Sequence, residues 1–239
     1  MFDLDVWLNK FECCVYADDL ISKIHLLNHQ TINKVNIITI KKAIYYAKKY
    51  HSNQKRESGE PYYSHPLIVA GMVADYCFKT DILVTAILHD SIEDTALTKN
   101  MINNIFDANI ANNVDDLTRV KFYGKITAAE IVKLLWSEKK YDLLLVKYFD
   151  RLHNLQTINA KSLIKIQHTV QETLKQFISL SLYFEKSNMP DLMTKKHMNM
   201  VDLCLKKLPK KLGNSKNTKT TVKNIFFEWT ESFLKLKFS

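Results

Sequence analysis

The sequence predicts an all-α fold, and two observations support that prediction. Glycine and proline number only four each among 239 residues, whereas β-rich folds use both residues in their many tight turns. Apolar residues also recur at helical spacing, as in segment 38–50, where Ile40, Ala43, Ile44 and Ala47 share one face. We therefore expect long helices joined by short polar links.

The individual helices are predicted from their start and stop residues. Pro66 suits the first turn of a helix. Thr80 or Asp81 can cap the next helix, and Thr98 can cap the one after it. Glycine within 122–125 indicates a loop, and Pro190 ends a long helix. The expected helices are 38–50, 65–79, 82–91, 99–106, 109–120, 127–137, 140–157, 162–186, 191–208 and 223–238.

Chain length allows one sizeable domain with an appendage. Segment 1–35 has weak periodicity and no assignable role, 36–208 forms the main helical domain, and 209–239 is a basic linker with a terminal amphipathic helix. The net charge of +9 attracts polyanions, but no base-reading motif is present, so a nucleic-acid partner is not expected.

Cysteine spacing and hydropathy indicate the compartment. The four cysteines form no C-x-x-C pair, which excludes a disulfide framework and a zinc finger. Segment 1–10 carries two aspartates and no apolar core, unlike a signal peptide, and the apolar runs are too short to span a bilayer. We expect a soluble cytoplasmic protein without a membrane partner; the sequence leaves its oligomeric state open.

Three polar clusters carry candidate chemistry, and the first follows the apolar run 82–88. His89, Asp90, Glu93 and Asp94 come directly after it. Burying such groups is costly unless a cation compensates them. On one helix, His89 and Glu93 would lie at i and i+4. The simpler alternative is an acid-rich helix end that faces water.

Each of the other two clusters is also weak evidence for a functional site when it is taken alone. Asp150 and Asn154 share a helix face, although Asp150 could equally form a surface ion pair with Arg151. Lys55 and Arg56 lie in a glycine-containing loop and suit a phosphate or a nucleobase. His65, which follows this loop, could ligate a metal or form a hydrogen bond with a neighbouring carboxylate.

Together the clusters indicate a metal site with two imidazoles and two carboxylates. Such a nitrogen and oxygen set suits Mn²⁺, Fe²⁺, Co²⁺ or Zn²⁺, and such an ion lowers the pKa of a bound water. Glu93 and Asp94, expected to be uncommitted, could orient that water or shuttle its proton. The predicted ligands are His65, His89, Asp90 and Asp150.

Four blocks of the chain resemble the hydrolase domain of RelA/SpoT-type alarmone enzymes, in the same order and spacing. They are Gln-Lys-Arg-Glu-Ser-Gly-Glu-Pro-Tyr at 54–62, Tyr-Ser-His-Pro-Leu at 63–67, Leu-His-Asp-Ser-Ile-Glu-Asp-Thr at 88–95 and Asp-Arg-Leu-His-Asn at 150–154. Segment 115–120 is a weaker version of the family's Val-Thr-Lys-Leu segment. The resemblance covers roughly residues 36–200.

This resemblance implies an HD-domain phosphohydrolase fold and Mn²⁺-dependent removal of the 3′-pyrophosphate from the guanosine polyphosphate (p)ppGpp. The four predicted ligands match the family's metal ligands, and Glu93 and Asp94 match its catalytic acidic pair. Arg56, with Lys55 beside it, matches the loop that contacts the guanine base. Asn154 and Thr157 match residues that hold the nucleoside.

The chain also departs from the family pattern. Phe149 precedes Asp150 where a small residue is usual, Gln156 stands where arginine is frequent, and Ser91–Ile92 replaces two small aliphatic residues. No stretch resembles the family's synthetase domain. Two alternatives stay open: hydrolysis of another nucleotide, such as the 2′-phosphate of NADPH, and a catalytically dead nucleotide-binding remnant.

Overall fold

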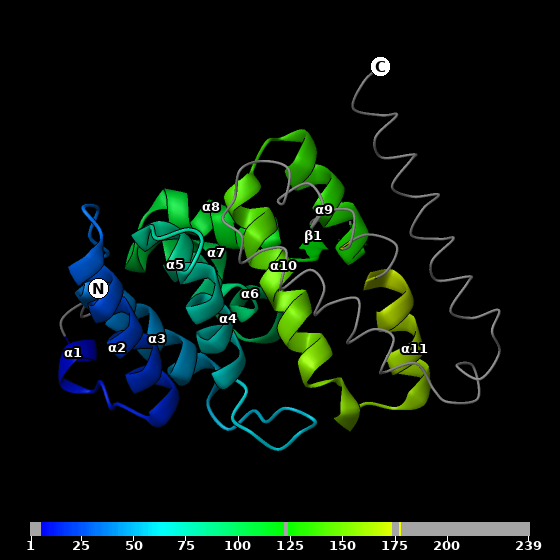
Figure 1. The fold of residues 1–239 in the computed structure, drawn as a ribbon, viewed down its shortest axis with the longest axis horizontal. Helices are drawn as coiled ribbons and strands as arrows, with labels where there is room; N and C mark the ends of the chain where they lie inside the picture. The colour runs from blue at the N-terminus through cyan, green and yellow to red at the C-terminus, as the bar shows by residue number, and fades with distance from the viewer. Residues whose placement is uncertain (1–5, 122–123, 174–176, 178–239) are drawn as a thin grey trace. The chain divides into compact units, whose positions relative to one another are not determined.

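The computed structural model describes residues 6–121, 124–173 and 177 (Figure 1). The chain divides into two compact units, Met1–Asp150 and Arg151–Ser239, and each is considered by itself. Within the described residues, helices dominate and the only sheet is a hairpin of two short antiparallel strands. The predicted all-α class is confirmed.

The helices and strands follow in a simple order along the chain. The first unit holds α1 Val6–Asn9, α2 Val15–Gln30, α3 Ile37–His51, α4 Ser64–Ala74, α5 Thr80–Leu88, α6 Ser91–Asp94, α7 Lys99–Ile105, α8 Ala108–Leu117, β1 Val120–Lys121, β2 Gly124–Lys125 and α9 Ala128–Ser137. Helix α10, Tyr141–Gln156, crosses the boundary between the units. The second unit continues with the 3₁₀ turn η1, Ile158–Ala160, and α11, Leu163–Glu172.

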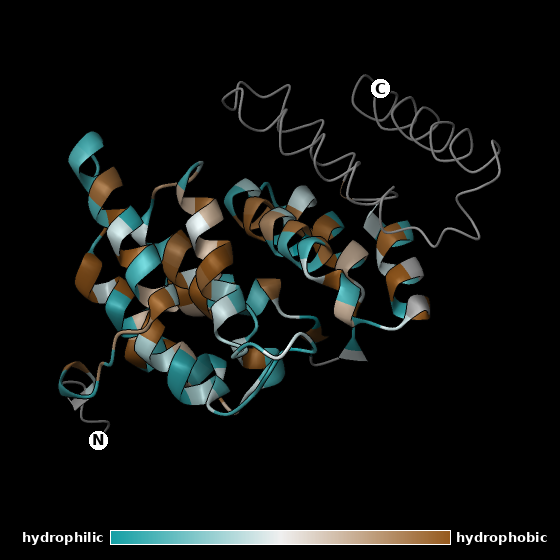
Figure 2. Ribbon diagram, turned by 60° about the horizontal axis from the view of Figure 1, so that its bottom comes forward, coloured by the Kyte–Doolittle hydropathy of each residue, from teal (hydrophilic) through white to brown (hydrophobic). Residues whose placement is uncertain are grey.

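Helix α5 lies at the centre of the first unit. Its residues 82–88 are all buried, because α5 packs against α3, α4 and α8. A helix enclosed on several sides is apolar all round, which explains why Thr85 is the only polar residue in segment 82–88; its hydroxyl donates to the carbonyl of Asp81. Figure 2 shows brown apolar segments alternating with polar ones along the surrounding helices. His89 and Asp90 follow the C-terminal end of α5, and His89 is buried.

Helix α2 was not predicted, because segment 1–35 showed only weak periodicity. Its buried residues Ala17, Leu20, Ile21 and Ile24 do keep the three-and-four spacing of an amphipathic helix. They pack on α3 and α4. The exposed acids of this helix hid the pattern, and burial on one face stabilises it.

Side-chain caps mark several helix starts, of which the sequence predicted only the one at Thr98. The predicted cap at Thr80 or Asp81 is wrong, because both residues lie within α5, whose N-cap is Lys79. Thr98 accepts a hydrogen bond from the backbone of α7, and Thr127 forms a reciprocal capping box with Glu130 on α9. Asp107 caps α8 by accepting a hydrogen bond from the backbone N–H of Ile110. Other boundaries differ: the helix expected at 65–79 ends at Ala74, and the loop expected at 122–125 contributes strand β2.

In the described part of the second unit, Arg151 and Glu172 form an ion pair. Arg151 donates to Glu172 over 2.6 Å, and its guanidinium lies 4.6 Å from the ring centroid of Phe177. Helix α11 covers part of the helix expected at 162–186. The helices expected at 191–208 and 223–238, and the linker between them, lie outside the described residues, as does Cys204. The predicted boundaries at 35 and 208 remain predictions.

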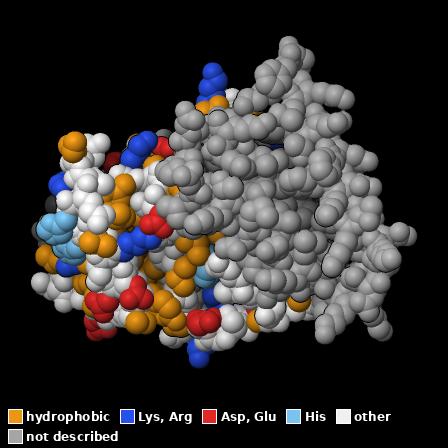
Figure 3. Space-filling view, viewed as in Figure 1, with side chains coloured by type: hydrophobic (Ala, Val, Ile, Leu, Met, Phe, Trp, Pro, Cys, Tyr) orange, Lys and Arg blue, Asp and Glu red, His pale blue; other side chains and the backbone are white. Residues whose placement is uncertain are grey.

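Two further features of the described residues concern membranes and nucleic acids as partners. No described helix combines the length and the apolar composition needed to cross a membrane. On the face seen in Figure 3, described acidic and basic side chains are interspersed with apolar ones. That part of the surface therefore carries no continuous basic stripe of the kind that follows a nucleic-acid backbone.

Candidate metal centre

Three side chains from different helices meet inside the first unit. His65 is the second residue of α4, His89 follows the end of α5, and Asp150 lies on α10. One ligand atom from each lies within 4.8 Å of the others, and both histidines are buried. These residues, far apart in sequence, could hold one metal ion.

Asp90, the fourth predicted ligand, lies at the edge of this group. Its Oδ1 is 3.2 Å from His89 Nε2, and its Oδ2 is 3.7 Å from His65 Nε2. Its side chain is 21% exposed, so it faces the outer side of the cluster. The fold thus brings the four predicted ligands together, with Asp90 the most accessible.

A break in the helix explains how neighbouring residues reach one cluster. From the sequence, we considered His89 and Glu93 to lie one turn apart on a single helix. Instead α5 ends at Leu88 and α6 begins at Ser91, so that spacing argument is wrong. On a straight helix, adjacent side chains diverge by about 100°. His89 and Asp90 form the turn between the two helices, and both side chains reach the cluster.

The imidazole of His89 is oriented as a metal ligand requires. Its Nδ1 donates to the carbonyl of Ala86 over 2.8 Å, which leaves the lone pair on Nε2. That nitrogen is buried without a hydrogen-bond partner. A metal-binding histidine characteristically donates its other ring N–H to a carbonyl or carboxylate. The donor set therefore fits a divalent transition metal.

Charge in the cluster also calls for a cation. Burial alone lowers the pKa of His89, yet Asp90 and Asp150 raise it on balance. Burial lowers the pKa of His65, and the bond to Asp150 only partly opposes this. The carboxylates thus draw positive charge into the centre, and a metal competes for that place with a proton.

Lys147 is a partner of the cluster that the sequence analysis missed. This buried lysine lies one turn before Asp150 and places its Nζ 2.8 Å from Asp150 Oδ2. Asp150 Oδ1 faces His65 at 3.1 Å. Burial raises the pKa of Asp150, but Lys147 and the two histidines hold it well below its usual range. The only sequence signal was the i, i+3 spacing to an aspartate.

Glu93 is committed to two cations, contrary to the expectation of an unpaired carboxylate. Arg119 donates to it through Nη2 at 2.6 Å and Nε at 3.2 Å, and Lys125 Nζ lies 2.9 Å away. Burial raises the pKa of Glu93, but these partners lower it to about 2. Arg119 follows α8 and Lys125 belongs to β2, so only the tertiary fold brings them together.

Asp94, the second predicted acid, bonds to a tyrosine. The hydroxyl of Tyr62 donates to Asp94 Oδ2 over 2.6 Å and lies 3.3 Å from Asp90 Oδ2. Partial burial raises the pKa of Asp94, while the Tyr62 bond opposes the rise. Because Asp94 is an exposed residue, water screens this effect. No feature of the sequence around Tyr62 indicated this contact, because Asp94 lies 32 residues further along the chain.

The loop that carries Lys55 and Arg56 is closed by backbone bonds. Arg56 N–H donates to Glu60, and Tyr62 N–H donates to Gln54, each over 2.9 Å. Gly59 adopts φ +99°, which L side chains rarely adopt. Lys55 is exposed and Arg56 half-buried. The loop presents two basic side chains on a defined backbone.

The remaining predicted contacts lie in the second unit. Asn154 and Thr157 follow Asp150 on or just after α10. Thr157 donates to the carbonyl of His153 over 3.0 Å. Their predicted role toward a nucleoside stays a prediction.

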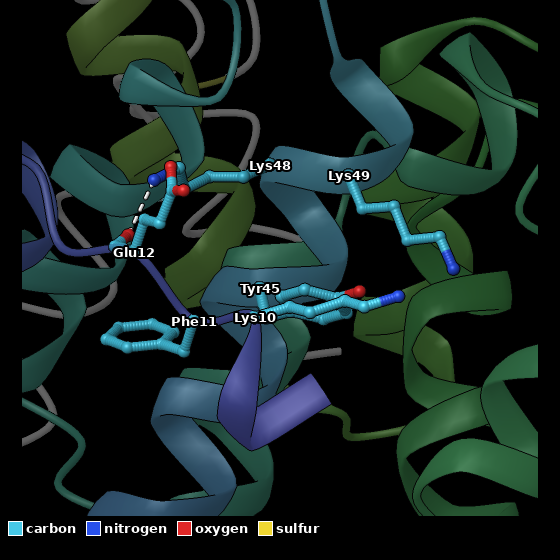
Figure 4. A pocket seen from close by; sticks show the side chains of 6 residues that line it. All are labelled: Lys10, Phe11, Glu12, Tyr45, Lys48 and Lys49. Carbon is cyan, nitrogen blue, oxygen red and sulfur yellow. Dashed lines mark hydrogen bonds between the residues drawn. The ribbon is translucent and has the colours of Figure 1, made fainter. Parts of the chain in front are cut away.

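A pocket of about 260 Å³ lies elsewhere in the first unit. Figure 4 shows it between α3 and the segment that joins α1 to α2; it is lined by Lys10, Phe11, Glu12, Tyr45, Lys48 and Lys49. It contains no histidine and none of the predicted site residues. The groups that could hold a metal lie in the buried cluster of His65, His89 and Asp150 and not in this pocket.

Comparison with known proteins agrees with this geometry. Residues 43–181 match the HD domain family. The match covers more than half of the chain, so the chain belongs to that family. The centre described above lies within the matched range.

Relatives also confirm the resemblance to RelA/SpoT-type proteins. The GTP pyrophosphokinase rsh of Brucella ovis is 36% identical over 153 residues, 62% of this chain and 20% of that protein. The GTP pyrophosphokinase of Myxococcus xanthus is 36% identical over 151 residues, 59% of this chain and 20% of that protein. The chain thus spans about a fifth of the length of these relatives.

More distant similarities extend further along the chain. The probable GTP diphosphokinase RSH2, chloroplastic, of Oryza sativa subsp. japonica is 28% identical over 193 residues, 75% of this chain and 26% of that protein. A solved structure described as "A metazoan ortholog of SpoT hydrolyzes ppGpp and plays a role in starvation responses" has a TM-score of 0.42 and 17% identity, with 80% of this chain and 94% of that chain covered. A TM-score of this size does not establish a shared fold.

Proposed function

We propose that this chain hydrolyses the 3′-pyrophosphate of the guanosine polyphosphate (p)ppGpp and that Mn²⁺ is its metal. The carrying observation is the buried group of His65, His89 and Asp150 in a chain of the HD domain family. Relatives named GTP pyrophosphokinases support a guanosine nucleotide as the substrate. Carboxylates and imidazoles together suit Mn²⁺ better than Mg²⁺.

In this proposal, each group of the centre has one task. His65, His89, Asp90 and Asp150 hold the metal, which supplies Lewis-acid activation of water when bound. Water attacks the phosphorus attached to the ribose 3′ oxygen, the bond to that oxygen breaks, and pyrophosphate leaves with GDP or GTP as the other product. The 3′ oxygen takes up one proton.

Proton movement falls to Asp94 rather than to Glu93. Two cations hold Glu93 ionised, whereas Asp94 is exposed and its pKa is raised. A group that exchanges protons near neutral pH works best with such an upward shift. Glu93 would instead fix Arg119 and Lys125 at the rim of the site. Lys55 and Arg56 would bind the base or a phosphate, and Asn154 and Thr157 the nucleoside.

Pyrophosphate release from ppGpp tests the proposal. The purified chain with Mn²⁺ should release pyrophosphate, and Asp90→Ala should abolish release while the far-ultraviolet dichroism stays helical. Asp19→Ala, at an exposed acid on α2, is the matched control and should behave as the wild type. If no divalent metal supports pyrophosphate release, the proposal is rejected. Parallel reactions with NADPH and deoxynucleoside triphosphates decide the substrate class.

A further inference from the structure

A group of polar contacts around Tyr62 adjoins the candidate metal centre. The structure assigns Tyr62 as a positioning residue: its hydroxyl holds the carboxylate of Asp94 in one orientation beside Asp90, and His51 holds its ring. The assignment rests on the proposed function, because it concerns how that reaction's carboxylates are arranged.

The hydroxyl of Tyr62 connects the two carboxylates unequally. It has one proton, and the shorter contact, 2.6 Å, is to Asp94 Oδ2. The longer contact, 3.3 Å, is to Asp90 Oδ2. The backbone N–H of Asp94 also donates to the carbonyl of Asp90 over 2.9 Å. Asp94 is therefore tied to a predicted metal ligand through both its backbone and its side chain.

The ring of Tyr62 is itself held in place. His51, a fully buried residue at the end of α3, stacks on it with centroids 4.7 Å apart and planes at 20°. His51 Nδ1 lies 2.8 Å from Gln54 Oε1, and Gln54 Nε2 donates to the backbone carbonyl of Asp94 over 2.8 Å. Because that carbonyl only accepts, the amide of Gln54 has one orientation and His51 Nδ1 carries the proton.

These contacts form a closed ring. It runs from the Asp94 carboxylate through Tyr62, His51 and Gln54 back to the Asp94 carbonyl. The backbone of Tyr62 also closes the loop that carries Arg56. This closed set of contacts therefore connects the loop that carries Arg56 to the candidate metal centre.

Positioning, rather than stability alone, is the expected role. An exposed aspartate without partners samples several rotamers, and misplacing a proton-transferring group costs rate. The hydroxyl contributes little to the fold, since Phe in its place keeps the stacked ring. Its loss should therefore affect turnover and metal binding much more than unfolding.

The test compares Tyr62→Phe with Tyr63→Phe in the full chain. Tyr63 is the adjacent residue, and its ring packs near Tyr16, with centroids 6.5 Å apart. Because it takes no part in the contacts around Tyr62, removing its hydroxyl is the matched control. For Tyr62→Phe we expect kcat at saturating Mn²⁺ to fall about 10- to 100-fold with little change in KM, and the Kd for Mn²⁺, measured by calorimetry without nucleotide, to rise. Tyr63→Phe should match the wild type in all three.

Two outcomes overturn the assignment: an unchanged kcat in Tyr62→Phe, or an unchanged Kd for Mn²⁺. A second arm uses Asp94→Asn, in whose background Tyr62→Phe should reduce kcat no further if Tyr62 acts through Asp94. Independent, additive losses would contradict that. For the ring contact, His51→Phe should retain more activity than His51→Ala, and equal losses would remove His51 from the assignment.

The same measurements separate this assignment from the proposed function. A wild-type chain that releases no pyrophosphate from ppGpp refutes the proposed function, while the Mn²⁺ Kd of Tyr62→Phe still reports on Tyr62. A wild type that is active together with a Tyr62→Phe variant of equal activity and metal affinity refutes only the assignment.

Discussion

The ion pairs of Glu93 should stabilise the metal-free protein, and Glu93→Gln removes them with little change in shape. The pKa of Glu93 is about 2, compared with about 4.3 for an unperturbed glutamate. At about 1.4 kcal/mol per pKa unit, the full shift corresponds to roughly 3 kcal/mol. The Arg119 and Lys125 side chains are 43% and 60% exposed, so water screens them. We expect a loss of about 1 to 2 kcal/mol in the free energy of unfolding.

The loss should depend on pH in one direction. A depressed pKa in the folded state means that Glu93 contributes its full stability above the unfolded value, near pH 4.3, and loses it as the pH falls toward about 2. Urea unfolding followed by far-ultraviolet dichroism, in a metal chelator, measures the difference between wild type and Glu93→Gln. This difference should be equal at about pH 7 and pH 5 and smaller at about pH 3.

Two results would refute the reasoning about Glu93. One is a Glu93→Gln variant as stable as the wild type at neutral pH. The other is a difference that persists undiminished in acid, since it would then arise from packing and not from charge. Asp19→Asn controls for the general effect of removing one exposed acid, and concentrated salt should reduce the Glu93 effect because its cations are partly exposed.

Three further predictions concern the framework of the site. Gly59→Ala should cost about 1 to 3 kcal/mol, because φ is +99° although a Cβ would meet no neighbour; an unchanged urea midpoint would contradict this. Asp107→Ala should cost about 1 kcal/mol, because Asp107 accepts from Ile110 N–H over 2.8 Å, and Asp107→Asn should restore most of it. Phe149→Ala should cost about 3 to 5 kcal/mol, because Phe149 is fully buried beside Tyr76; a thermal melt like that of the wild type would show that this ring is not part of the core.

Much of the fold followed from local sequence features. The apolar run 82–88 lies in the buried helix α5, and Thr98 caps α7 as predicted. These features act within one or two helical turns, so a single segment encodes them. The helix boundary at Leu88 could not be predicted in this way, because the turn at His89 and Asp90 depends on what surrounds the end of α5.

Within the site, the sequence by itself identified which residue types meet. It predicted His65, His89, Asp90 and Asp150 as one set, and the fold brings them together. It could not predict their partners. The pairing of Lys147 with Asp150, of Arg119 and Lys125 with Glu93, and of Tyr62 with Asp94 decides the charge and orientation of each carboxylate.

The physical reason for this difference is the sequence separation of the interacting residues. Helix formation and capping depend on bonds between residues three or four positions apart, which a sequence shows directly. The protonation state of a carboxylate depends on every charge and hydrogen bond within a few ångströms, and in this chain those groups come from α3, the segment after α8, β2, α10 and the loop before α4. The sequence determined the helices and the candidate ligands, while only the tertiary structure decided that Glu93 is held between two cations and that Asp94 is oriented by Tyr62.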